Sequence, residues 1–154
     1  MVSGDKKVFE KSLTLVEKIA SNVFFLEKPG LATKMKLINN MVLGAFMAAL
    51  SEAIVLGENT GIDKEQVIEI LSAGAGNSVL LNAKKEKLLN EDFSPHFSAA
   101  MLNKDLNYFT ELIQSLNKPS FLGAITKQLY ATALKEDFKN KDFSVMYEVM
   151  KRLS

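Results

Sequence analysis

The sequence contains no cysteine and no tryptophan, and it has a single histidine, His96. The absence of cysteine excludes disulfides, thiolate nucleophiles and cysteine metal sites, so nothing indicates a secreted, disulfide-stabilised protein and a cytoplasmic one is expected. One histidine cannot form a zinc cluster, and the loop sequence around it argues against a Ser-His-Asp arrangement. We therefore expect no metal site.

An excess of charge of one sign is also missing. Lysine and arginine number 19 against 18 acidic residues, which gives a net charge of +1 and no long-range field to attract nucleic acid or anionic lipid. The longest uncharged run, Leu37 to Ser51, contains two asparagines and falls short of the ~20 apolar residues that a membrane span needs. We expect a buried helix there, and neither nucleic acid nor membrane as a partner.

The remaining pattern is mostly helical. Apolar residues recur at helical spacing in seven segments, and the longest is apolar around most of its circumference, which predicts burial on several sides. Asp63 and Gln66 fit a capping box at the start of the third segment. The predicted helices cover residues 6–20, 31–59, 64–72, 78–89, 98–116, 123–135 and 144–153.

One short segment does not fit a helix. The run NVFFL, Asn22 to Leu26, is aromatic and β-branched and ends before Pro29 and Gly30, which is typical of a strand. No second strand is evident, and a lone strand leaves its backbone donors and acceptors unpaired. Either this segment is not a strand or the rest of its sheet is missing.

The most informative polar residues lie at the start of the long apolar helix, in the stretch KMKLINN. Lys36 and Asn40 are four residues apart and therefore project from one face, with Asn39 close to it. An ammonium and an amide at this spacing can bind a small anionic or carbonyl-bearing molecule. The alternative is a solvated helix start, where Lys34 and Lys36 extend into water and the asparagines bond locally. Spacing alone favours this second interpretation.

Landmarks along the whole chain resemble one known family. GLATKMKLINN at 30–40 is followed by SEA at 51–53, GID at 61–63, F-x-P-x-F at 93–97, NKDL at 103–106 and KDFS at 141–144. Together, in this order, they resemble the C-terminal domain of the β-hydroxyacid dehydrogenases, a family that includes 3-hydroxyisobutyrate dehydrogenase. The segment KMKLI most resembles the corresponding sequence of the glyoxylate and succinic semialdehyde reductases.

The resemblance implies a fold and a domain division. We expect a mainly α, multi-helix C-terminal dehydrogenase domain, similar to that of 6-phosphogluconate dehydrogenase, built on one long central helix. Residues 30–154 would form this substrate-binding and dimerisation domain. Residues 1–29 resemble the last helix and strand of a Rossmann domain, whose GxGxxG turn and substrate loop do not occur here. The expectation is a C-terminal portion of a longer enzyme, in which NVFFL is the edge of a missing sheet.

The resemblance also implies roles for four residues. Lys36 corresponds to the catalytic lysine and Asn40 to the substrate-binding amide, with Asn39 as a possible second substrate contact. Lys104, from the family's Lys-Asp pair, would reach the cofactor, NAD or NADP.

The reaction implied is hydride transfer between the nicotinamide and a small β-hydroxy acid or aldehyde acid, in a homodimer or higher homo-oligomer. This chain alone is expected to be inactive, because the cofactor domain is absent. The competing hypothesis is a non-catalytic helical dimerisation or interaction module.

Overall fold

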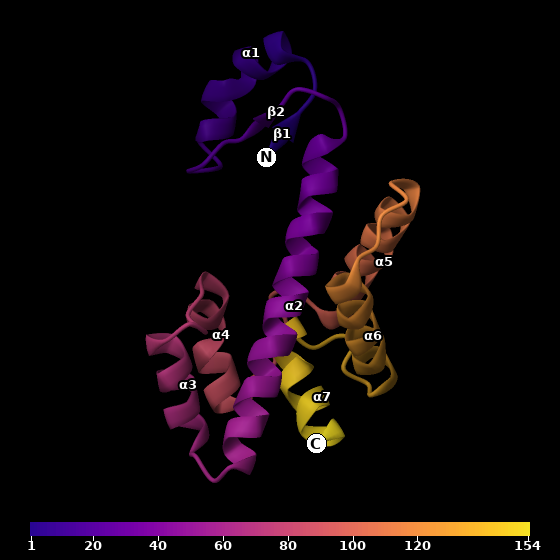
Figure 1. The fold of residues 1–154 in the computed structure, drawn as a ribbon. Coiled ribbons are helices and arrows are strands. Elements are labelled where there is room, and N and C mark those ends of the chain that lie inside the picture. The colour runs from indigo at the N-terminus through magenta and orange to yellow at the C-terminus, as the bar shows by residue number, and fades with distance from the viewer. The chain divides into compact units, whose positions relative to one another are not determined.

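The computed structural model describes residues 1–154 and is mainly α-helical, as predicted (Figure 1). The chain forms two compact units, Met1–Asn39 and Asn40–Ser154. Its elements in order are β1 (Val2–Ser3), α1 (Lys6–Glu17), β2 (Phe25–Leu26), α2 (Leu31–Asn59), α3 (Lys64–Ala73), α4 (Val79–Asn90), α5 (Ala99–Ser115), α6 (Phe121–Lys135), a 3₁₀ turn (Phe143–Val145) and α7 (Met146–Leu153).

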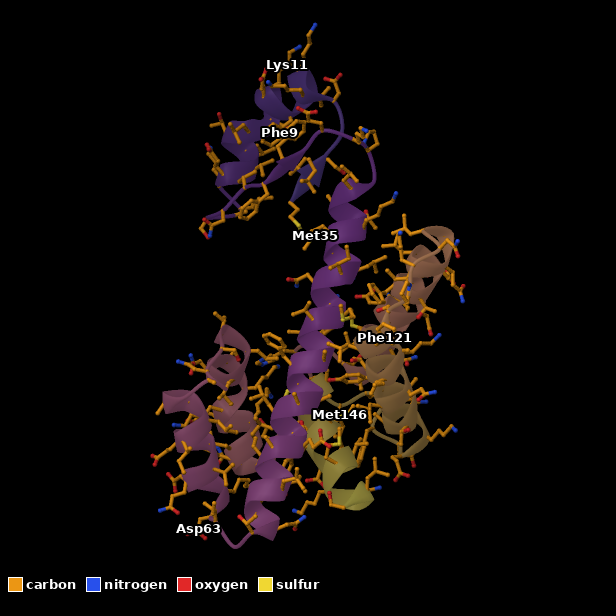
Figure 2. The ribbon with its side chains drawn as sticks, in the orientation of Figure 1. Phe9, Lys11, Met35, Asp63, Phe121 and Met146 are labelled. Atoms are coloured by element: carbon orange, nitrogen blue, oxygen red, sulfur yellow. The ribbon has the colours of Figure 1, made fainter.

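The first unit contains a small β-α-β motif. The Asp5 side chain caps α1 by accepting a 3.0 Å hydrogen bond from the backbone amide of Val8. Phe9, labelled in Figure 2, stacks on Phe25 with ring centroids 4.4 Å apart, which packs the helix on the strand pair. This motif is followed by the first turns of α2, up to Asn39.

The strand expected at residues 22–26 is shorter than predicted and has a partner. Only Phe25–Leu26 is extended in a ladder, and it pairs in parallel with Val2–Ser3, with Val2 opposite Phe25. The expectation of an unpaired strand is therefore wrong. A two-residue strand such as Val2–Ser3 is too short to produce the alternation by which strands are recognised in a sequence.

The second unit is built around α2 from Asn40 onward, with α3 and α4 on one side and α5, α6 and α7 on the other (Figure 1). The bounds of α2 agree with the predicted range. Met47 and Ile54 are completely buried. At Gly44 an added Cβ would lie 2.9 Å from the Thr126 methyl group of α6, so the missing side chain allows the two helices to approach closely.

By length and composition, α2 would also be able to cross a membrane. This is weak evidence for a span, because the core helix of a soluble protein satisfies the same criteria. The side of α2 that carries Met47 and Ile54 packs inside the helical unit. Helices cover α2 on two sides, as expected, but a stripe containing Val42, Phe46 and Leu56 remains exposed.

A buried ion pair anchors the C-terminal segments. Lys84 of α4 places its ammonium 2.8 Å from Asp142, and both side chains are almost inaccessible to water. The same carboxylate accepts hydrogen bonds from the backbone amides of His96 and Phe97 and from the Ser144 hydroxyl. One side chain therefore joins α4, the loop before α5 and the 3₁₀ turn before α7. The loop contains the F-x-P-x-F landmark, and the KDFS landmark leads into the 3₁₀ turn.

The predicted capping box at the third helix is not formed. Asp63 lies at the turn between α2 and α3 (Figure 2) and occupies the N-cap position, but its side chain makes no capping hydrogen bond. Asp63 and Gln66 are both exposed, so water is available to satisfy their polar atoms and the free amides of the first turn.

Candidate functional site

Three of the four predicted site residues lie on α2. Lys36 and Asn39 are exposed on the turns of α2 that belong to the first unit. Asn40 begins the second unit and is partly buried. Lys36 precedes Asn40 by four residues in this continuous helix, which is the spacing that places two side chains on one helical face.

The Asn40 side chain is held by a carboxylate from another helix. Its amide nitrogen donates a 2.7 Å hydrogen bond to Asp105 of α5. Only 3% of Asp105 is accessible to solvent, so this charged acceptor is stronger than it would be in water. One N–H of the Asn40 amide is thereby bonded to Asp105, and this fixes the orientation in which its second N–H and its carbonyl oxygen are presented to another group.

Lys104 lies beside the same carboxylate but is turned toward solvent. Its ammonium is 3.9 Å from Asp105, at the outer limit of an ion pair, and 57% of its side chain is exposed. Because the Lys104 side chain is largely exposed and the two groups are this far apart, the pair contributes little to stability. The Lys104 ammonium is therefore accessible to a ligand, and the structure brings it together with Asn40 around Asp105.

Asp105 is the site residue to which the sequence analysis gave no role. It falls three residues after Leu102 and four before Phe109, both of which are buried, so it lies on the apolar face of α5. A carboxylate at such a position is a pattern that could have identified it, because buried acidic residues need a partner.

The side chains around Asp105 have the chemistry to bind a dinucleotide and a small polar substrate. An exposed ammonium such as that of Lys104 can bind the phosphates or polar groups of a dinucleotide. The amide of Asn40 adds a neutral group of fixed orientation, whose carbonyl oxygen can accept from a substrate hydroxyl and whose second N–H can donate to a substrate carbonyl oxygen. Lys104 and Asn40 thus provide one charged and one neutral positioning group at the junction of α2 and α5.

Comparison with known proteins decides the family. Residues 30–150 match the family described as the NAD-binding domain of NADP-dependent 3-hydroxyisobutyrate dehydrogenase. The chain belongs to this family. The match begins at Gly30 and includes Lys36, Asn40, Lys104 and Asp105. The family resemblance inferred from the landmarks is thus confirmed.

Individual relatives include enzymes and a nuclear factor. The chain is 32% identical over 147 residues to the cytokine-like nuclear factor N-PAC of Gallus gallus, covering 96% of this chain and 27% of that protein. It is 27% identical over 151 residues to glyoxylate/succinic semialdehyde reductase 2, chloroplastic, of Arabidopsis thaliana, covering 98% of this chain and 42% of that enzyme.

A solved structure of Mycobacterium tuberculosis 3-hydroxyisobutyrate dehydrogenase with L-serine is similar in fold. It superposes with a TM-score of 0.87 and 26% identity over 98% of this chain and 54% of that enzyme. The chain therefore spans about a quarter to a half of the length of these relatives.

Proposed function

We propose that the chain is the substrate-binding and dimerisation portion of an NAD(P)-dependent oxidoreductase acting on a small β-hydroxy acid or aldehyde acid. The observation that carries this proposal is the Asn40 amide fixed by Asp105 at 2.7 Å, four residues after Lys36 on the same helix. In a merely solvated helix start, the asparagine would bond locally or to water. A long-range bond to a buried carboxylate is instead typical of a preorganised binding group.

The proposed role of each residue in the reaction follows from the chemistry of its side chain. When bound, the nicotinamide supplies or accepts the hydride. Lys36 donates a proton to the alkoxide oxygen as the carbonyl is reduced, and it accepts the hydroxyl proton in the oxidative direction. Asn40 orients the substrate oxygen by accepting from it when it is a hydroxyl, and by donating its second N–H when it is a carbonyl oxygen, with Asn39 as a second substrate contact. Lys104 holds the dinucleotide.

A second candidate function is a non-catalytic helical module for dimerisation or partner binding. It is supported by the similarity to N-PAC, whose name is that of a nuclear factor and not of an enzyme. The two candidates differ in what they require of Lys36. A module has no need of an ammonium at this position, whereas the reductase depends on it.

The deciding experiment replaces Lys36 in the protein that joins this chain to a dinucleotide-binding domain. Lys36→Ala should lower kcat by at least ~10²-fold, the lower range for the loss of a general acid, with little change in melting temperature. Lys34→Ala is the matched control, because Lys34 is an exposed lysine of the same helix that falls outside the four-residue spacing.

Turnover of Lys36→Ala within a few-fold of the wild type would contradict the assignment of Lys36. Absence of any reductase activity in the unsubstituted two-domain protein would instead favour the non-catalytic module. The 154-residue chain by itself is proposed to be inactive, because it contains no GxGxxG turn.

A further inference from the structure

Two large side chains of α5 flank the carboxylate that holds Asn40, and both remain exposed. Met101 lies four residues before Asp105 and Tyr108 lies three residues after it, so the three side chains project from one face of the helix. Met101 and Tyr108 are each 50% exposed, whereas Asp105 between them is 3% exposed. The polar pair of Asn40 and Asp105 is thus bordered on α5 by two accessible apolar groups.

Tyr108 is also placed next to Lys104. The two residues are four apart on α5, which brings their Cβ atoms to about 5–6 Å from each other. Aromatic side chains in an α-helix lean toward its N-terminus and cover the preceding turn. For Tyr108 this is the turn that carries Lys104 and Asp105. Its ring therefore borders the position at which the exposed Lys104 ammonium can hold a ligand.

A half-exposed phenol ring is suited to a flat ligand group, because its open face can stack on another ring. A nicotinamide dinucleotide has two such rings, the adenine and the nicotinamide. In the proposed function Asn40 orients the substrate, and hydride transfer requires the reacting ring to lie in contact with that substrate. Tyr108 is only roughly 4.5 Å from Asp105 along the helix axis, at 1.5 Å per residue. The ring beside Tyr108 is therefore the nicotinamide, since the adenine lies at the far end of the dinucleotide.

The alternative is that Tyr108 is an ordinary solvated residue, because single exposed apolar side chains are common on soluble proteins. Leu116, the C-cap residue of α5, is such a side chain and is 52% exposed. It lies eight residues beyond Tyr108, roughly 12 Å along the axis at 1.5 Å per residue. Tyr108 differs from it in lying within one turn of both Lys104 and Asp105. Leu116 therefore provides a matched control of similar exposure on the same helix.

We propose that Tyr108 is a cofactor-positioning residue whose ring packs against the nicotinamide of the bound dinucleotide, with Met101 extending the apolar wall on the other side of Asp105. This inference rests on the proposed function and names one more residue of the same site. A ring held on one face has less freedom to turn away from the substrate, which favours the geometry needed for hydride transfer.

The test uses the protein that joins this chain to a dinucleotide-binding domain, titrated by calorimetry with NADH and NADPH. Tyr108→Ala should raise the dissociation constant of the preferred cofactor at least about 5-fold, the low end of what an aromatic stacking contact contributes to binding a base. Tyr108→Phe should bind within about 2-fold of the wild type, because it keeps the ring. Leu116→Ala should leave the affinity unchanged, and circular dichroism should show equal helicity in all the variants.

Titration with ADP-ribose and its 2′-phosphorylated form identifies the part of the dinucleotide involved, because these ligands lack only the nicotinamide. The wild type and Tyr108→Ala should bind them equally well. An equal loss of affinity for ADP-ribose and for the whole cofactor would overturn the proposal in favour of a contact with the adenosine half. Unchanged affinity of Tyr108→Ala for both cofactors would overturn it in favour of a solvated surface residue.

A second readout follows the nicotinamide itself. Acrylamide should quench the emission of the bound reduced cofactor more strongly in Tyr108→Ala than in the wild type, because loss of the ring opens one face of the nicotinamide to solvent. Equal quenching would contradict the proposed contact. An active wild-type protein whose cofactor binding is insensitive to Tyr108→Ala would overturn this inference alone. A wild-type protein that binds no dinucleotide would overturn both this inference and the proposed function.

Discussion

The buried carboxylate of Asp142 offers the sharpest test of how the helical unit is held together. Asp142→Asn removes the negative charge but preserves the size of the side chain. In the wild type its two carboxylate oxygens lie 2.8 and 2.9 Å from the Lys84 ammonium, and the carboxylate also accepts a 2.7 Å bond from the Ser144 hydroxyl. The substitution leaves the Lys84 cation buried without its counter-charge.

The expected loss of stability is large because neither partner is accessible to water. Removing one member of a buried ion pair costs about 3–5 kcal/mol, compared with a total unfolding free energy of about 5–15 kcal/mol for a typical domain. For a chain of this size we expect the melting temperature to fall by at least about 6 °C. Glu136→Gln, which breaks the exposed pair with Arg152, should cost less than about 1 kcal/mol.

The assay is urea unfolding followed by far-UV circular dichroism for the wild type and both variants. An effect of Asp142→Asn no larger than that of Glu136→Gln would refute the reasoning. A double variant, Lys84→Met with Asp142→Asn, should recover much of the lost stability, because it removes the unpaired buried cation and keeps a side-chain oxygen that can accept hydrogen bonds from the surrounding amides.

The same pair predicts a dependence on pH. Burial opposes ionisation of Asp142, but hydrogen bonds from Lys84 and Ser144 outweigh it and hold the pKa of this carboxyl below its ordinary value of 3.8. Because the folded-state pKa is the lower one, the stabilisation is complete above about pH 4 and is lost as the pH falls through the folded-state pKa. The stability difference between the wild type and Asp142→Asn should therefore shrink only in strong acid.

Two further predictions concern the site and require the protein that includes a cofactor domain. Lys104→Ala should weaken cofactor binding, measured by calorimetry with NADH and NADPH, and change the substrate KM much less; unchanged cofactor affinity would show that this lysine is only a solvated surface residue. Asp105→Ala should lower kcat/KM by about 10²-fold, because Asn40 loses the partner that orients its amide. Normal kinetics in Asp105→Ala would show that the hydrogen bond to Asn40 is structural, and retained helicity is the control for both variants.

Much of the helical fold could be predicted from the sequence because its determinants are local. The bounds of α2 agree with the prediction, and the glycines at its two ends, Gly30 and Gly61, adopt positive φ angles of 84° and 93°, a conformation that other residues avoid. Apolar periodicity likewise indicated each of the other helices. The strand Val2–Ser3 escaped prediction, because two residues are too few to show the alternation that identifies a strand.

The contacts that define the site could not be predicted in the same way. Asn40 and Asp105 are 65 residues apart in sequence, and Lys84 and Asp142 are 58 apart. No periodicity in a single sequence specifies which distant polar groups will meet, because that depends on how the helices pack. The spacing of Lys36 and Asn40 was visible because both lie on one helix, whereas the contact of Asn40 with α5 required the fold.

The structure also separates landmarks that support the fold from residues that bear on chemistry. The F-x-P-x-F and KDFS segments meet at Asp142, whose hydrogen bonds reach His96, Phe97 and Ser144. These interactions stabilise the fold of this chain and give no information on whether it is part of an enzyme. The group on α2 and α5, with Asn40 and Lys104 around Asp105, differs from them because its Lys104 ammonium is accessible to a ligand. The choice between a reductase and a non-catalytic module therefore depends on these residues and Lys36. The F-x-P-x-F and KDFS segments do not help to decide it.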